Sequence, residues 1–140
     1  MQPTLDEQQS IDRLERHVAD TVAVMDPAPR LEIQSSLTQP CDSPDDGGPQ
    51  GRIVVSVRYL LRDLPAERHD AVFDAVAARW SSAEWTVLEN FSDRDELPTI
   101  YVQNNRDGFQ VRLLESVDGV LSVGVNSPCV WPNGTPEPES

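Results

Sequence analysis

The two cysteines are the side chains whose type and spacing point most directly to chemistry. Cys41 and Cys129 each follow a proline, and they lie near the two edges of the expected core. Two thiols are too few for a structural zinc site, and they do not form the C-x-x-C motif of redox proteins. We therefore predict a disulfide between them, a bond typical of proteins outside the cytoplasm. The alternative is a pair of unrelated buried thiols.

The two histidines, His17 and His69, are the natural candidates for acid–base catalysis. A Ser-His-Asp triad would need a nucleophile on a sharp turn such as G-x-S-x-G, and the sequence has no such motif. A cysteine–histidine pair is disfavoured because both cysteines are assigned to the disulfide. We interpret each histidine as a residue on the surface or at the boundary of its own helix. We expect no catalytic residue and no cofactor.

Carboxylates are abundant, and one loop gathers three of them. Asp42, Asp45 and Asp46 lie in the run C-D-S-P-D-D-G-G, and calcium favours several oxygen ligands from a flexible loop. The spacing does not match the EF-hand pattern, and no glutamate follows at its twelfth position. We therefore interpret these aspartates as solvated loop acids and predict no metal site, while keeping them as the candidates for a bound cation.

The tryptophans are the remaining side chains that could make a binding contact. Trp80 and Trp85 flank the expected junction of a helix with a strand, where both are predicted to pack beneath the helix. Trp131, in C-V-W-P, either covers the disulfide or forms an exposed contact for a partner. Packing is favoured because aromatic side chains contribute most of their energy by burying area.

The charge balance excludes some partners. The chain has 140 residues, with 24 acidic residues against 11 basic ones, all arginine, and a net charge of -13. Nucleic acid and anionic lipid surfaces are therefore not expected as partners. No apolar run is long enough for a transmembrane segment, and the polar residues after Met1 do not form an export signal. We expect either a cytosolic protein or a mature fragment of an exported one.

Hydrophobic periodicity predicts the elements that position these residues. Residues 5–25 and 66–81 predict amphipathic helices, the first with a capping box of Thr4 and Glu7. Alternating apolar residues predict strands at 31–37, 52–63, 85–91, 100–102, 109–113 and 121–125. Residues 38–51 are expected to form a long loop.

These elements predict one α+β domain over residues 1–131 and a flexible tail over 132–140. Successive hairpins favour an antiparallel sheet, and two amphipathic helices need one face of it to bury their apolar stripes. We expect a two-layer sandwich of five to six strands with both helices on one face, in a monomeric protein.

Three short motifs carry a resemblance to a known family. They are the Cys-Asp-x-Pro run at Cys41, the strand entry Gly51-Arg52-Ile53, and the terminal Ser127-Pro128-Cys129-Val130-Trp131-Pro132. Together they resemble the small LppA-like lipoproteins of the actinobacterial cell envelope. The resemblance implies a lipid anchor upstream of Gln2, attached at a lipobox cysteine that this sequence does not contain.

These observations favour a non-enzymatic extracytoplasmic domain that binds a protein or an envelope ligand. Two alternatives stay open at this point. One is a calcium-dependent or carboxylate-based hydrolase module that uses the loop acids. The other is an acidic cytosolic partner protein, similar to an immunity protein or chaperone, which would neutralise a basic protein.

Overall fold

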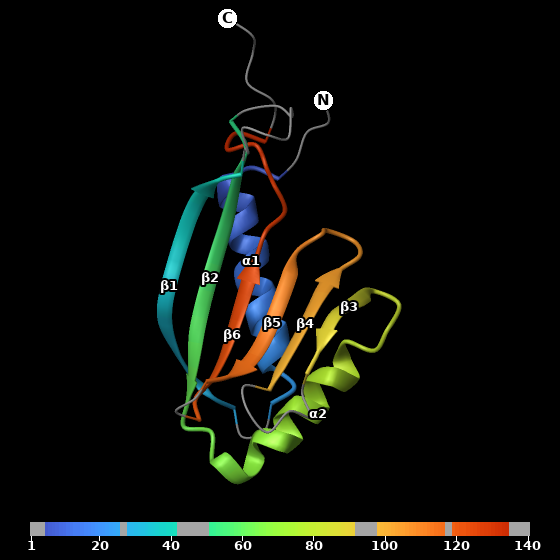
Figure 1. Cartoon of the computed structure of the whole chain (residues 1–140). Helices are drawn as coiled ribbons and strands as arrows, with labels where there is room; N and C mark the ends of the chain where they lie inside the picture. The colour runs from blue at the N-terminus through green and yellow to red at the C-terminus, as the bar shows by residue number, and fades with distance from the viewer. Residues whose placement is uncertain (1–4, 26–27, 42–50, 92–97, 117–118, 135–140) are drawn as a thin grey trace, which may run out of the picture.

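The computed structural model describes residues 5–25, 28–41, 51–91, 98–116 and 119–134. In the order of the chain, its elements are α1 (Glu7–Val22), β1 (Arg30–Pro40), β2 (Ile53–Arg62), the 3-10 turn η1 (Ala66–Arg68), α2 (His69–Arg79), β3 (Trp85–Asn90), β4 (Thr99–Asn104), β5 (Gln110–Glu115) and β6 (Leu121–Asn126) (Figure 1).

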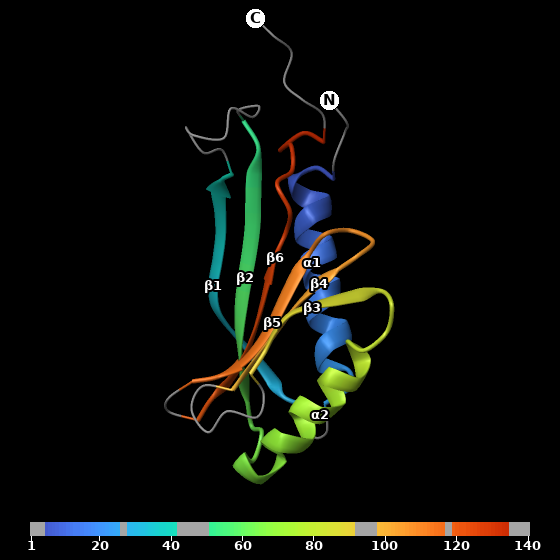
Figure 2. The ribbon, with the colours of Figure 1, turned by 45° about the vertical axis from the view of Figure 1, so that its right-hand side comes forward.

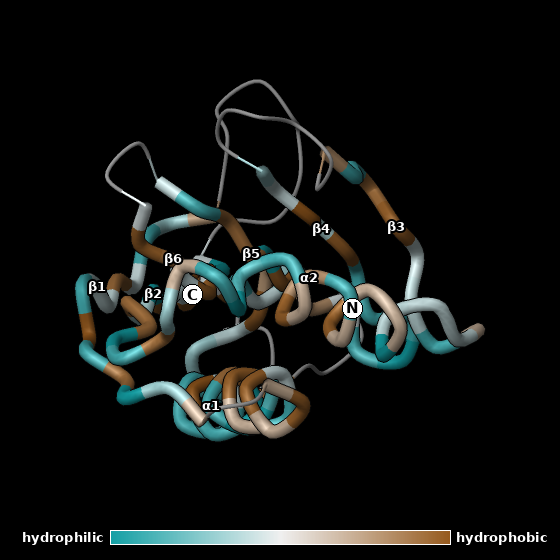
Figure 3. The backbone as a smooth tube through the Cα atoms, turned by 90° about the horizontal axis from the view of Figure 1, so that it is seen from below, coloured by the Kyte–Doolittle hydropathy of each residue, from teal (hydrophilic) through white to brown (hydrophobic). Residues whose placement is uncertain are grey.

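Within the described residues, the strands form one six-stranded sheet in the order β1-β2-β6-β5-β4-β3. Each neighbouring pair is antiparallel. Both helices lie on the same side of the curved sheet (Figures 2 and 3). The predicted α+β sandwich is confirmed, and the sheet does not close into a barrel.

The core lies between the sheet and the helices, because each strand turns alternate side chains towards them. The central strands contribute Val55, Val57, Leu61, Ile100, Val102, Val111, Leu113, Leu121, Val123 and Val125, and the helices contribute Leu14, Val18, Val72, Phe73 and Val76. The other side chains of the sheet form a second, largely polar face. Only the helix-facing side is therefore a conventional hydrophobic core.

The N-cap of helix α1 lies two residues after the predicted one. Asp6 is the N-cap: its carboxylate accepts a hydrogen bond from the Gln9 N–H at 2.7 Å, and the Gln9 side chain accepts one from the Asp6 N–H at 3.0 Å. This D-x-x-Q pair replaces the predicted Thr4–Glu7 box, and Thr4 lies outside the described residues. The helix ends at Val22, before the predicted residue 25.

The second helical segment is divided into two parts. Residues 66–68 form the turn η1, and α2 follows from His69 to Arg79. The predicted buried stripe of Val72, Phe73, Val76 and Trp80 is confirmed. The ring centroids of Trp80 and Trp85 lie 5.9 Å apart, in agreement with the predicted packing of these two residues.

The predicted loop at 38–51 begins too early, because β1 continues to Pro40. Thr38 pairs with Val55 and Pro40 with Ile53, and the Cys41 N–H donates to the Arg52 carbonyl at 3.0 Å. Every residue of β1 is exposed. A strand on the sheet edge needs no apolar alternation, so its polar second half gave no strand signal.

Candidate functional site

The disulfide fixes the segment that follows β6. Cys41 and Cys129 are bonded, with their Cα atoms 5.8 Å apart, which confirms the predicted pair. Beside them, Val130 forms a backbone bridge with Ile53 in which each N–H donates at 2.8 Å. The segment after β6 is thereby held against the start of β2.

Trp131 belongs to this fixed segment and is not a surface contact. Only 3% of its surface is exposed. A Cβ placed on Gly51 would meet the Trp131 ring at 3.6 Å, which is ordinary contact. The exposed role considered for this residue is therefore wrong, and the packing role is the one that the structure supports.

His17 is buried between α1 and the sheet, so of the two positions predicted for it, surface or boundary, the structure shows the boundary. Its Nε2 lies 2.7 Å from Asp107 Oδ2, and Arg13 Nη1 lies 3.3 Å from the same oxygen. The imidazole also packs against the rings of Trp85 and Phe109, at centroid distances of 5.7 and 5.4 Å. The pair therefore joins the middle of α1 to the turn after β4.

The geometry of that turn presents Asp107 to the helix. Gly108 adopts a φ of 76°, in the left-handed region that favours glycine, and its N–H donates to the Asn104 carbonyl at 2.9 Å. Asp107 Oδ1 accepts from the Phe109 N–H at 3.0 Å, which leaves Oδ2 to face α1. The predicted tight turn is confirmed, but nothing in the sequence indicated its histidine partner.

His69 makes the corresponding contact for α2. Its Nδ1 lies 2.5 Å from Glu115 Oε1 at the end of β5. Both imidazoles lie at boundaries between a helix and the sheet, and within the described residues no hydroxyl or thiol is hydrogen-bonded to either ring. Each pair thus links a helix to the sheet.

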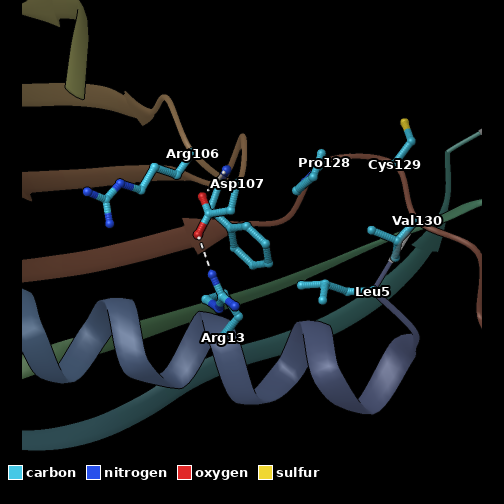
Figure 4. Close-up of a pocket in the computed structure, with 8 residues that line it drawn as sticks. Leu5, Arg13, Arg106, Asp107, Pro128, Cys129 and Val130 are labelled. Carbon is cyan, nitrogen blue, oxygen red and sulfur yellow. Dashed lines mark hydrogen bonds and ion pairs between the residues drawn. The ribbon is translucent and has the colours of Figure 1, made fainter. Parts of the chain in front are cut away.

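A cavity of about 360 Å³ opens beside the His17 contact. The start of α1, the turn after β4 and the disulfide-bonded segment enclose it (Figure 4). Its apolar lining comes from Leu5, Phe109, Pro128 and Val130, and its polar lining from Arg13, Arg106 and Asp107. We call this cavity the terminal pocket.

The charges at the terminal pocket are internally balanced. Arg13 reaches from α1 to Asp107, whereas Arg106 points away from the apolar lining (Figure 4) and pairs with Glu84 at 2.7 Å. The interior is therefore apolar, with paired ions at the opening. Cavities of this size and lining are the usual form of small-ligand sites.

The candidate metal ligands Asp42, Asp45 and Asp46 lie outside the described residues. Across the ranges that the structure describes, no group of three or more histidine, cysteine or acidic residues is placed to hold a metal ion. The described helices include none that is long and apolar enough to cross a membrane.

Comparison with family models, with curated proteins and with solved structures found no match in any of the three.

Proposed function

We propose that this chain is a non-enzymatic binding domain of the cell envelope, and that its terminal pocket receives an apolar group of a partner protein or an envelope ligand. The observation that carries the proposal is the apolar cavity bounded by Leu5, Phe109 and Pro128. The disulfide-bonded segment forms one of its walls, so the wall is preorganised. A preformed pocket avoids the entropy cost of ordering its lining when a ligand binds.

An extracytoplasmic location fits the same features. The Cys41–Cys129 bond is of the kind that persists in oxidising compartments. The resemblance to LppA-like lipoproteins supports an attachment to the envelope by a lipid anchor. An acidic surface suits a monomeric domain that avoids nucleic acid and anionic lipid.

A fluorescent apolar probe tests the pocket. We expect the uncharged probe N-phenyl-1-naphthylamine to bind the full chain saturably, at one site per molecule. Leu5→Trp places a larger side chain in the pocket wall and should weaken probe binding at least tenfold. Leu37→Trp is the matched control, because Leu37 is 51% exposed on β1. Equal binding to both variants and the parent chain would overturn the pocket as the binding site.

Thiol alkylation tests the compartment. The protein isolated from its native cells under non-reducing conditions should present no thiol to the reagent until it is unfolded and reduced. Two alkylated cysteines in the folded protein, Cys41 and Cys129, would contradict the envelope location and favour the cytosolic alternative.

A further inference from the structure

The sheet face that points away from the helices carries an unusual row of side chains. The strand register places Ser35, Arg58, Gly124, Arg112 and Tyr101 side by side across β1, β2, β6, β5 and β4. The two arginines are thus neighbours across a single glycine. Adjacent strands lie about 4.8 Å apart, so the two Cα atoms are separated by about 10 Å.

Gly124 leaves the middle of this row without a side chain. A cavity of about 140 Å³ lies there, and its lining includes both arginines and Tyr101. Two further hydrogen-bonding side chains in its lining, Ser56 and Asn126, form a cross-strand pair two residues from Arg58 and Gly124. We call this cavity the arginine hollow.

Arg58 and Arg112 differ in their partners from five other arginines of the described residues. Arg13, Arg30, Arg62, Arg79 and Arg106 each lie within 4.0 Å of a carboxylate oxygen. No carboxylate of the described residues lies that close to Arg58 or Arg112. The described residues thus place two neighbouring cations side by side without an acid partner, in a chain with 24 acidic residues, although like charges at close range repel.

The surroundings hold one of these cations in place. The Arg112 guanidinium lies over the Tyr101 ring, 4.6 Å from its centroid, as a cation–π contact requires. The Tyr101 hydroxyl donates to Gln110, which fixes the ring from its far end. Glu89 on β3 is the cross-strand partner of Tyr101, so its carboxylate lies one strand beyond the hollow.

We propose that the arginine hollow binds a single phosphate group, with Arg58 and Arg112 as its ligands from opposite sides. A guanidinium presents paired N–H donors that match two oxygens of an oxyanion. A tetrahedral phosphate offers oxygens to both arginines at once, whereas a carboxylate offers only two oxygens in one plane. Gly124 allows the anion to approach the backbone between them.

The net charge of -13 restricts the ligand to a small molecule. A polyanion would bring many phosphates against the acidic surface, so the attraction of two arginines would be outweighed. The phosphate is therefore either free or carried as an ester on a small neutral group.

Titration of the full chain with inorganic phosphate and with glycerol phosphate tests this site, with acetate at equal ionic strength as the carboxylate arm. Calorimetry should detect binding of phosphate at least tenfold tighter than acetate, and the arginine side-chain NMR signals of Arg58 and Arg112 should move. Tighter binding of glycerol phosphate identifies an ester ligand, and tighter binding of inorganic phosphate identifies the free ion. Equal affinity for acetate and both phosphates would overturn the proposal.

Substitutions then locate the site. Arg58→Gln and Arg112→Gln should each weaken phosphate binding at least tenfold, whereas Arg30→Gln makes the same charge change at an exposed position and should leave it within twofold. Gly124→Val should block the hollow. Gly124→Ala is a milder variant, because its Cβ would meet the Val57 carbonyl at 3.7 Å, which is ordinary contact. It should also weaken phosphate binding, and it serves as the test if Gly124→Val fails to fold.

The outcome separates this proposal from the terminal pocket. Leu5→Trp should weaken binding of the apolar probe at least tenfold and leave phosphate affinity unchanged, whereas Gly124→Ala should weaken phosphate binding and leave probe binding unchanged. Unchanged phosphate affinity in both arginine variants would overturn the arginine hollow without affecting the terminal pocket.

Discussion

At the scale of single residues, Asp107 makes several contacts that no sequence pattern indicated. One carboxylate oxygen accepts a backbone hydrogen bond from Phe109, and the other lies against His17 and Arg13. Its side chain is 11% exposed, so these contacts are poorly screened by water. Asp107 therefore joins α1 to the turn after β4, at the rim of the terminal pocket.

Removal of this carboxylate should destabilise the fold. Asp107→Ala leaves the buried His17 imidazole and the Phe109 N–H without their partner, and a buried polar group without a partner costs about 1–3 kcal/mol. We expect a loss of that size in the unfolding free energy measured with urea. Glu32→Ala is the control, since Glu32 pairs with Arg62 at an exposed site and should cost less than about 0.5 kcal/mol. Equal losses in the two variants would contradict this role of Asp107.

Tyr59 should make stability depend on alkaline pH. Its hydroxyl donates to both carboxylate oxygens of Glu15 at 2.9 Å. Burial, followed by the hydrogen bond and the negative charge of Glu15, raises the pKa of Tyr59 above its usual value of 10.0. The unfolded chain therefore loses this proton at lower pH than the folded chain, so the stabilisation is present below about pH 10 and is lost as the pH rises through the folded pKa.

Two measurements check the sign of this effect. The phenolate absorbance of Tyr101→Phe, which retains Tyr59 as its only tyrosine, should titrate above the ordinary tyrosine range in the folded state. Glu15→Gln should lower that pKa without returning it fully, because burial is the larger cause. A titration at or below the usual pKa of tyrosine would show that the contact does not hold in solution.

At the scale of elements, α2 is attached through a small number of large side chains. Phe73 and Val76 are among its buried residues, and Trp80 directly after it is 1% exposed. Together with the His69–Glu115 contact at the start of the helix, these side chains attach α2 to the sheet.

Truncation of one of these side chains should be costly. Phe73→Ala creates a cavity and should lower the unfolding free energy by about 3–5 kcal/mol, as large-to-small core changes do. The comparison is Val87→Ala on the edge strand β3, where the side chain is 50% exposed and the expected loss is below about 0.5 kcal/mol. Circular dichroism during thermal unfolding measures both. A small loss for Phe73→Ala would mean that α2 is loosely held.

The elements also show what could be predicted from the sequence. Strands with one buried face, such as 121–125, and the apolar stripe of α2 were predictable because burial imposes a period on their side chains. The end of β1 at Pro40 was not, since an edge strand carries no such period. Asp107 and Glu115 could not be assigned to His17 and His69, because those contacts form only when distant segments meet. The arginine hollow depends in the same way on the register of β2, β6 and β5.

At the scale of the whole molecule, one covalent bond joins the end of β1 to the segment that follows β6. Cys41 and Cys129 are separated by 88 residues in sequence. A loop of that length restricts the unfolded chain strongly, and the chain-entropy model assigns such a bond about 4–5 kcal/mol. The bond also keeps the segment around Val130 in place as a wall of the terminal pocket.

The double variant Cys41→Ser/Cys129→Ser should therefore lose stability and probe binding together. We expect the unfolding free energy to fall by up to about 4–5 kcal/mol, measured with urea, and the binding of N-phenyl-1-naphthylamine to weaken. Phosphate binding at the arginine hollow provides an internal control, because that site lies in the sheet and should be retained by the folded fraction. An unchanged unfolding free energy would contradict the stabilising role of the bond.

The strand order has a consequence for how fast the chain folds. Strands β1 and β2 form one local hairpin, and β3 to β6 form a local meander. Within the described sheet, these two groups of strands join where β2 pairs with β6, as at Val57 and Val125. Pairings between distant segments slow folding, because the loop must close before the contacts form. The disulfide lies next to the end of this junction, at the Ile53–Val130 bridge. Stopped-flow refolding should therefore be faster for the oxidised chain than for the cysteine-free variant, with the meeting of β2 and β6 as the rate-limiting event in both.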